Sequence, residues 1–365
     1  MLKVKPATPS STTEIPVTVG SVSRSSDRIA VWDIAKGIGI ILVVYGHCLR
    51  GLTSAGLISE FSFVRVTDYV IYTFHMPLFF FISGIFVRNA ISKGAAQFWR
   101  NRLLTIVYPY LLWSILQGSL QVALAGSHIS NTQISIDHLY VILWQPISPF
   151  WFLYALFFSS GIAYLTRSLN TVPLVALAAI LFLLSHAIFP WQVADIAYAN
   201  FYLSLGILVA AKLPRPESIT EHASPIMLWG AFGVATAIGY LVHIPERMWV
   251  PSALLAIGAI LASCKNIESH AHKLTRLLAT IGRASMAIYV MHVLILGGMR
   301  ALLFRVADIS QPAVLIFLCT SMGVFIPIAV QGISDRLNIS PLLGLPRLWQ
   351  RKRRHAIYST NQRSL

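Results

Sequence analysis

The sequence Asp33-Ile-Ala-Lys36-Gly-Ile-Gly-Ile-Ile-Leu-Val-Val-Tyr-Gly-His47 decides the fold, because it places an acid, a base and an imidazole within one apolar run of membrane length. Ionisable side chains are costly in a bilayer, so those that occur there usually line a functional cavity. Lys36 and His47 are eleven residues apart, or about three helical turns, so they share one face about 16 Å apart along the axis. We interpret this stretch as a membrane helix with a functional polar face.

The composition extends this interpretation to the whole chain. Of its 365 residues, 56% are hydrophobic and only 11% are charged, whereas soluble domains carry about 25% charged residues. We therefore expect an all-α integral membrane protein. The net charge of +15 would suggest nucleic acid in a soluble protein, but basic cytoplasmic loops explain it better here. The three cysteines show neither metal-ligand spacing nor a disulfide framework, so we expect no metal site.

Ten apolar runs are long enough to cross a bilayer. They cover residues 30–50, 67–87, 103–124, 151–167, 172–190, 195–211, 225–243, 249–264, 284–304 and 312–333. With a cytoplasmic N-terminus, the cytoplasmic segments hold 22 Lys and Arg residues and the opposite loops hold 5. This bias predicts a bundle of about ten transmembrane helices with both termini in the cytoplasm. The shortness of the fourth, sixth and eighth runs leaves nine or eleven spans as alternatives.

The predicted domain organisation has a membrane domain at 27–340 between two tails. Residues 1–26 are rich in Ser, Thr and Pro and are expected to be a disordered cytoplasmic tail. Residues 341–365 contain four consecutive basic residues, 351–354, and form a basic cytoplasmic tail suited to anionic lipid. The outer segment 125–150 is long for a bare loop, which favours an interfacial or re-entrant element.

Two histidines are the first candidates for catalysis. His47 lies near the outer end of its helix, where a neutral imidazole could take a proton from a hydroxyl; an interface-anchored histidine is the alternative. His75 lies beside Pro77, which loosens the helix and frees carbonyl groups to line a cavity. A packing role is its alternative. Asp33 is a third candidate, and it could equally pair with Lys36 three residues later.

Basic residues on the cytoplasmic side are candidates for an anionic ligand. Lys36 could meet phosphates as a point charge. Arg100 and Arg102 precede the third span and could form a phosphate clamp, although topology alone also accounts for arginines at this place.

Aromatic and polar residues nearer the outer side are candidates for an acceptor. Trp151 opens the fourth span, where it could stack on a sugar ring or belong to the aromatic belt. Ser285, Tyr289 and His292 recur at spacings of four and three, which predicts one polar stripe on an apolar helix. A stripe facing lipid would be unfavourable, so we expect it to face the bundle.

Five motifs follow one another along the chain. They are Asp33-x-x-Lys36-Gly37 with Gly46-His47, Phe74-His75-Met76-Pro77 with Ser83-Gly84, Arg102 with Pro109-Tyr110, Trp151-Phe152-Leu153, and Gly282-x-x-Ser285-x-x-x-Tyr289-x-x-His292. In this order they resemble the bacterial acyltransferase 3 family of membrane O-acyltransferases, in particular its fucose 4-O-acetylase-like branch.

The resemblance implies a multi-pass protein of the bacterial cytoplasmic (inner) membrane that moves an acyl group, usually acetyl, from acyl-CoA to a hydroxyl of an exported or lipid-linked sugar. The family's catalytic histidine falls on His47, and its basic residue eleven positions earlier falls on Lys36, where many members have Arg. Many members also carry Arg-x-x-Arg before the third span. Thr105 stands at the second of these positions, which puts the donor-phosphate contact in question.

The residue assignments from the sequence fall into three groups. Catalytic roles are assigned to His47, Asp33 and His75, acyl-CoA binding to Lys36, Arg100 and Arg102, and acceptor binding to Trp151, Tyr289 and His292. Membrane lipid is the other expected partner, nucleic acid is not expected, and the oligomeric state is left open. Two other functions remain as alternatives: a multi-pass carrier in which His47 and Lys36 relay protons or substrate, and a non-catalytic subunit of polysaccharide export.

Overall fold

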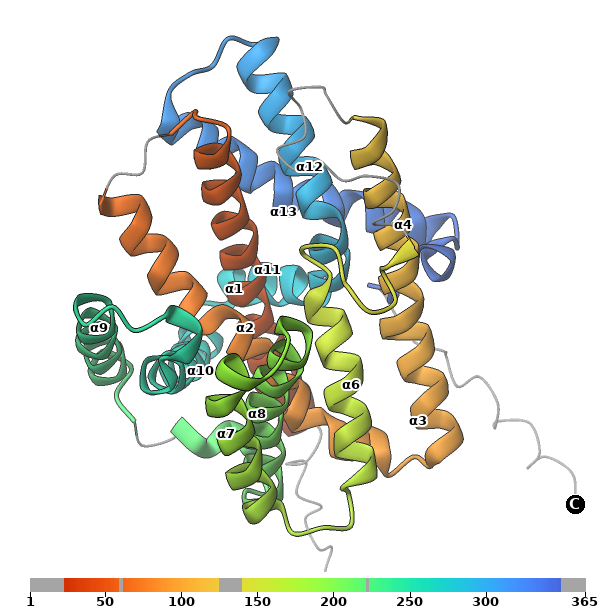
Figure 1. The fold of residues 1–365 in the computed structure, drawn as a ribbon, viewed down its shortest axis with the longest axis vertical. Coiled ribbons are helices and arrows are strands. Elements are labelled where there is room, and N and C mark those ends of the chain that lie inside the picture. The colour runs from red at the N-terminus through yellow and green to blue at the C-terminus, as the bar shows by residue number, and fades with distance from the viewer. Residues whose placement is uncertain (1–22, 59–61, 125–139, 221–222, 349–365) are drawn as a thin grey trace, which may run out of the picture.

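The computed structural model describes residues 23–58, 62–124, 140–220 and 223–348, and every regular element within these ranges is a helix (Figure 1). The predicted all-helical class is confirmed. Most of the predicted N-terminal tail, the basic cluster at 351–354 and most of the 125–150 segment lie outside the described residues.

The helices alternate with short connections along the chain. The longer helices are α1 (Ser23–Ser54), α2 (Ser62–Ile91), α3 (Ala95–Arg102), α4 (Tyr108–Ala123), α6 (Trp151–Leu165), α7 (Thr171–Ile188), α8 (Trp191–Lys212), α9 (Pro225–Leu241), α10 (Val250–His270), α11 (His272–Arg283), α12 (Ser285–Arg305) and α13 (Pro312–Arg336). The short ones are η1 (Leu103–Val107), η2 (Pro216–Thr220), η3 (Glu246–Met248) and η4 (Ser340–Leu343).

The apolar helices coincide with the predicted spans. Seven described helical segments are long and apolar enough to cross a membrane, among them Ala95–Ala123, in which α3, η1 and α4 are continuous. Three shorter apolar helices, Trp151–Leu165, Thr171–Ser185 and Pro225–Leu241, occupy the other predicted runs. The count of ten crossings and the cytoplasmic termini stay predictions.

Helix α1 lies at the centre of the fold, where it packs against α2, α10, α11, α12 and α13. In Figure 1, α6 and the continuous α3–α4 helix are seen lengthwise, whereas α9 and α10 are seen nearly end-on. The helices of the bundle therefore cross one another at large angles. Glycines allow the closest crossings. A Cβ added at Gly37 would lie 2.2 Å from the carbonyl oxygen of Leu278, and one at Gly282 would lie 1.8 Å from that of Asp33, so the backbones of α1 and α11 are in direct contact.

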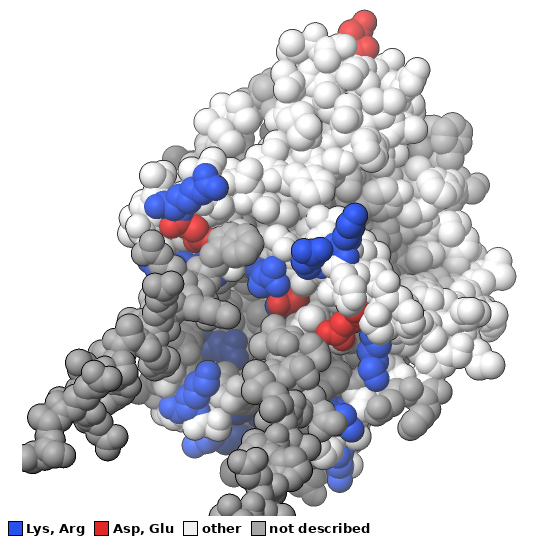
Figure 2. All heavy atoms as spheres, turned by 180° about the vertical axis from the view of Figure 1, so that it is seen from behind, with Lys and Arg blue, Asp and Glu red and all other residues white. Residues whose placement is uncertain are grey.

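Helix α11 was not among the predicted elements. It is amphipathic: Leu278 and Ile281 are buried, whereas Lys273 and Arg276 are exposed. Figure 2 shows Lys and Arg gathered across the middle and lower part of one face of the molecule, while the upper part is nearly free of charge. This uneven distribution of basic residues agrees with the charge bias read from the sequence.

Candidate active site

Three histidines from three helices approach one another near the C-terminal end of α1. The ring centroid of His47, on α1, lies 5.0 Å from that of His292, on α12, in an edge-to-face arrangement. The third histidine, His75 on α2, is near His47 through Tyr72 of the same helix. The ring centroid of Tyr72 lies 6.3 Å from that of His47 and 4.6 Å from that of His75. We call His47, Tyr72, His75 and His292 the ring cluster. His75 and His292 are buried and His47 is half-buried.

Backbone carbonyls fix the orientation of two of these imidazoles. Nδ1 of His75 lies 2.7 Å from the carbonyl oxygen of Ile71, and Nδ1 of His292 lies 2.7 Å from that of Tyr289. Because a carbonyl oxygen only accepts, Nδ1–H is the donor in both rings, and a neutral imidazole then offers its Nε2 lone pair as an acceptor. Nε2 of His292 is buried without a hydrogen-bond partner among the described residues. A buried polar atom without a partner is rare and calls for an explanation.

Tyr72 was missed by the sequence reasoning. Its hydroxyl is also buried without a hydrogen-bond partner in the described part of the chain. The ring packs on Gly46: a Cβ added there would lie 3.0 Å from Cε2 of Tyr72 and 3.6 Å from its Cζ. Gly46 therefore leaves space for the hydroxyl-bearing edge of Tyr72 beside His47.

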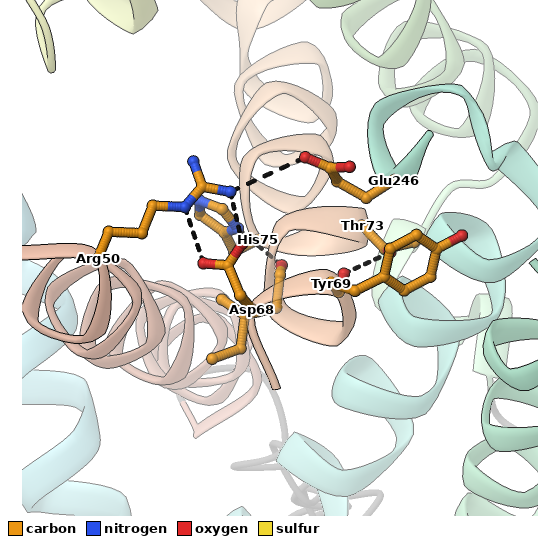
Figure 3. Close-up of polar contacts among 7 residues, drawn as sticks. Arg50, Asp68, Tyr69, Thr73, His75 and Glu246 are labelled. Carbon is orange, nitrogen blue, oxygen red and sulfur yellow. Dashed lines mark hydrogen bonds and ion pairs between the residues drawn. The ribbon is translucent and has the colours of Figure 1, made fainter. Parts of the chain in front are cut away.

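Arg50 covers one face of the Tyr72 ring and was also missed. Its guanidinium carbon lies 3.3 Å from the centroid of the Tyr72 ring. Nε and Nη2 each donate a 2.7 Å hydrogen bond to one oxygen of Asp68, and Glu246 lies 3.8 Å away. Figure 3 shows Arg50 reaching across to Asp68 of α2 and to Glu246. This two-bonded pairing with a planar carboxylate fixes the guanidinium plane.

The helical spacing carries a signal for both residues. Arg50 follows His47 by three residues, and Tyr72 follows Asp68 by four and precedes His75 by three. Residues at these spacings share a helix face.

Of the other residues predicted to bind the acceptor, Tyr289 lies beside the ring cluster, 6.1 Å from His292 between ring centroids, and Trp151 lies beside Arg247. The Tyr289 hydroxyl donates a 2.6 Å hydrogen bond to the carbonyl oxygen of Pro149, so this hydroxyl ties α12 to the segment before α6. Arg247 lies 4.8 Å from the Trp151 ring centroid and forms a 2.5 Å ion pair with Asp195. Trp151 is half-buried. The Arg247 guanidinium carbon lies equally close, 4.8 Å, to the ring centroid of Tyr198.

Asp33 and Lys36 are not part of the ring cluster. Lys36 forms a 2.6 Å ion pair with Asp33, and Arg283 of α11 lies 3.8 Å from the same carboxylate. Asp33 precedes His47 by fourteen residues of one helix, or about 21 Å along its axis. The structure thus groups Asp33, Lys36 and Arg283 as a second polar site toward the start of α1.

Arg102 and Arg100 lie at the end of α3, immediately before the π-helical turn η1. The Arg102 guanidinium lies 5.1 Å from the Phe98 ring centroid, and its Nε is buried without a hydrogen-bond partner in the described ranges. Arg100 is exposed. Thr105 of η1 donates a hydrogen bond to the carbonyl oxygen of Asn101 in α3. Such π turns occur frequently at functional sites.

Within the described residues, no group of three or more His, Cys, Asp or Glu side chains is arranged to hold a metal ion. The three cysteines are free thiols and are buried.

Comparison with known proteins places these features in a family. Residues 29–331 match the acyltransferase 3 family, which is described as an acyltransferase domain. The chain is 25% identical to nodulation protein NolL of Sinorhizobium fredii over 324 residues, which cover 81% of this chain and 84% of that protein. It is 33% identical to nodulation protein NolL of Mesorhizobium japonicum over 136 residues, which cover 37% of this chain and only 35% of that relative. No solved structure matches the chain significantly.

The family match covers all five sequence motifs and the whole ring cluster. It confirms the predicted family and the prediction that the protein is an acyltransferase. The chain belongs to the acyltransferase 3 family of multi-pass membrane proteins.

Proposed function

We propose that this protein transfers an acyl group, acetyl in the first instance, from cytoplasmic acyl-CoA to a hydroxyl of an exported or lipid-linked sugar at the bacterial inner membrane. The observation that carries the proposal is the ring cluster. It brings three imidazoles from α1, α2 and α12 together, and Nε2 of His292 is buried there with no hydrogen-bond partner among the described residues. A hydroxyl is a ligand that satisfies this acceptor.

His47 is the general base in this proposal. It is the member of the cluster that contacts both His292 and Tyr72, and an imidazole titrates close to neutral pH. His292 accepts a hydrogen bond from a second hydroxyl of the sugar and thereby holds the reacting hydroxyl beside His47, which takes its proton. His75, whose Nδ1–H is committed to Ile71, borders the site from α2.

The donor phosphates are assigned to the cytoplasmic side. Arg102 fits an anion because its Nε is buried and unpaired among the described residues, and a guanidinium binds phosphate oxygens through charge-assisted hydrogen bonds. Exposed Arg100 adds charge beside it. Lys36 and Asp33 lie within α1, between Arg102 and the ring cluster in the proposed path of the donor. We assign Lys36 to contact with the pantetheine arm of acyl-CoA, and Asp33 to fixing the position of Lys36 through their ion pair.

The proposed activity is tested with the full-length protein in lipid nanodiscs, radiolabelled acetyl-CoA and a panel of octyl glycosides that includes octyl fucoside. We expect acetyl-CoA-dependent release of free thiol, together with a gain of about 42 daltons per modified hydroxyl on the glycoside, which is the mass of an acetyl group replacing hydrogen. Surface glycans of cells with and without the protein should differ by the same mass. Equal glycan masses and no thiol release would refute the proposal.

Replacing Arg102 should weaken donor binding specifically. Arg102→Met keeps an apolar stem over Phe98 and removes the guanidinium. Loss of a hydrogen bond to a charged group costs about 1.5–3 kcal/mol, so KM for acetyl-CoA should rise about 10- to 100-fold. Arg88→Met removes an exposed arginine at the end of α2 and should leave KM unchanged. An unchanged KM in Arg102→Met would remove this residue from the donor site.

A carrier remains the competing function, because polar side chains inside a membrane bundle also serve solute pathways. The nanodisc assay separates the two functions: a carrier moves its solute without consuming acetyl-CoA, whereas the acyltransferase releases free thiol in proportion to acetylated glycoside.

A further inference from the structure

The Tyr72 hydroxyl has no assigned function, although it lies in the ring cluster and is buried without a partner among the described residues. A buried hydroxyl that makes no hydrogen bond in the membrane costs free energy. A ligand that accepted its hydrogen bond would remove this cost. The question is which group of the reaction it meets.

Acyl transfer requires a hydrogen-bond donor for the oxygen that becomes negative when the acyl carbon is attacked. Three neighbouring side chains, Tyr289, His75 and His292, are poor candidates for this donor. The hydroxyl of Tyr289 is bonded to the carbonyl oxygen of Pro149. The N–H groups of neutral His75 and His292 are donated to backbone carbonyls, so their other nitrogens only accept.

Ser285 lies at the first residue of α12. It precedes His292 by seven residues, so it is about 10 Å away along the axis. Of the donors considered, Tyr72 is therefore the one beside His47 whose proton is uncommitted.

The surroundings of Tyr72 hold its ring in one place. Arg50 covers one face at 3.3 Å and is itself fixed by two hydrogen bonds to Asp68. Because Gly46 has no side chain, the Cε2–Cζ edge of the Tyr72 ring can lie against it, beside His47. Preorganised donors are the effective ones in catalysis because they need no rearrangement when charge develops.

We propose that Tyr72 is a catalytic residue whose hydroxyl donates a hydrogen bond to the oxyanion of the acyl group, and that Gly46, Arg50 and Asp68 are positioning residues for it. This inference rests on the acyl transfer proposed above. It also gives the Gly46-His47 pair of the first motif a physical meaning: the glycine makes room for the oxyanion donor next to the base.

His47 takes the proton of the sugar hydroxyl while the sugar oxygen bonds to the acyl carbon, and the carbonyl π electrons move onto the acyl oxygen. That oxyanion accepts the hydrogen bond of Tyr72, which keeps its own proton. When the carbonyl re-forms, the carbon–sulfur bond breaks and the departing thiolate takes the proton from His47. The products are the sugar ester and the free CoA thiol.

Tyr72→Phe tests the proposal because it keeps the ring under Arg50 and over Gly46 and removes only the hydroxyl. Removing one oxyanion donor costs about 10²- to 10³-fold in kcat, and we expect that loss in the nanodisc assay with KM for acetyl-CoA and for octyl fucoside unchanged. The matched control is Tyr69→Phe, one turn earlier on α2, whose hydroxyl donates a 2.8 Å bond to the carbonyl oxygen of Ile244. It should lower the melting temperature and leave kcat unchanged.

A double-mutant cycle tests the positioning role of Gly46. Gly46→Ala puts a methyl group 3.0 Å from the Tyr72 ring, so the ring must shift and kcat should fall. In a Tyr72→Phe background there is no hydroxyl left to misplace, so the same Gly46→Ala change should lower kcat much less; residues that act together are non-additive. Equal effects in both backgrounds would assign Gly46 to packing alone and overturn its positioning role.

The outcomes separate this inference from the proposed function. If the parent protein acetylates glycosides and Tyr72→Phe turns over at the same kcat, the acyltransferase proposal stands and the role of Tyr72 is refuted. If the parent protein releases no thiol and changes no cellular glycan, the proposed function is refuted and the role of Tyr72 falls with it.

Discussion

Replacing His47 is expected to abolish acyl transfer while leaving a correctly inserted protein. A positioned general base contributes about 10²- to 10⁴-fold to a rate, so kcat for both His47→Ala and His47→Gln should fall by that factor. The glutamine variant keeps a planar polar side chain between His292 and Tyr72, the two rings that His47 contacts, but it supplies no basic nitrogen. The measurement is single-turnover acetyl transfer in nanodiscs at saturating acetyl-CoA.

The control for this prediction is His272→Ala, which removes an exposed histidine at the start of α11. Its rate and melting temperature should equal those of the parent protein. Substantial turnover by His47→Gln, at a melting temperature matching the parent, would exclude His47 as the base. Loss of the fold in His47→Ala alone would not decide the matter, which is the reason for the second variant.

The sequence predicted the helices well because membrane helices need long apolar runs, and these are visible without tertiary information. Helix α11 was missed because it does not need such a run. It buries Leu278 and Ile281 while Lys273 and Arg276 stay exposed, so its average hydropathy is low. Its place beside α1 depends on Gly282, which was read only as part of a motif.

The site was predicted residue by residue but not as an arrangement. His47, His75 and His292 were each chosen from local motifs, yet their proximity depends on how α2 and α12 are rotated against α1. Tyr72 escaped notice because a tyrosine toward one end of a membrane helix is typical of the aromatic belt. Only the three-dimensional structure shows that its hydroxyl is buried and unpaired among the described residues.

The separation of Lys36 from His47 could be read directly from the sequence, because both residues lie on one continuous helix. The ion pair between Lys36 and Asp33 follows from their spacing of three residues. What could not be predicted is the third member, Arg283, which α11 brings to within 3.8 Å of Asp33. Local spacing thus predicts contacts within a helix, whereas contacts between helices require the crossing geometry.

The crossing of α2 and α8 carries the largest expected effect on stability. A Cβ added at Gly84 would lie 2.0 Å from the carbonyl oxygen of Leu203, and one at Gly206 would lie 2.1 Å from that of Phe81. Backbone cannot move aside as a flexible side chain can, so Gly84→Ala must push the two helices apart. Overpacking of this kind costs about 1–3 kcal/mol or more, and we expect a clearly lower melting temperature and yield in detergent.

Gly297→Ala is the matched control for this crossing, because a Cβ at that position in α12 has no atom of the described residues within 4 Å. Replacing glycine by alanine in an open helical position stabilises by about 0.5–1 kcal/mol, so this variant should melt at or above the temperature of the parent protein. A melting temperature that falls in Gly84→Ala but does not fall in Gly297→Ala would show that backbone contact between α2 and α8 holds the bundle together. An unchanged melting temperature for Gly84→Ala would contradict that contact, and with it the placement of α2, which carries Tyr72 and His75 into the site.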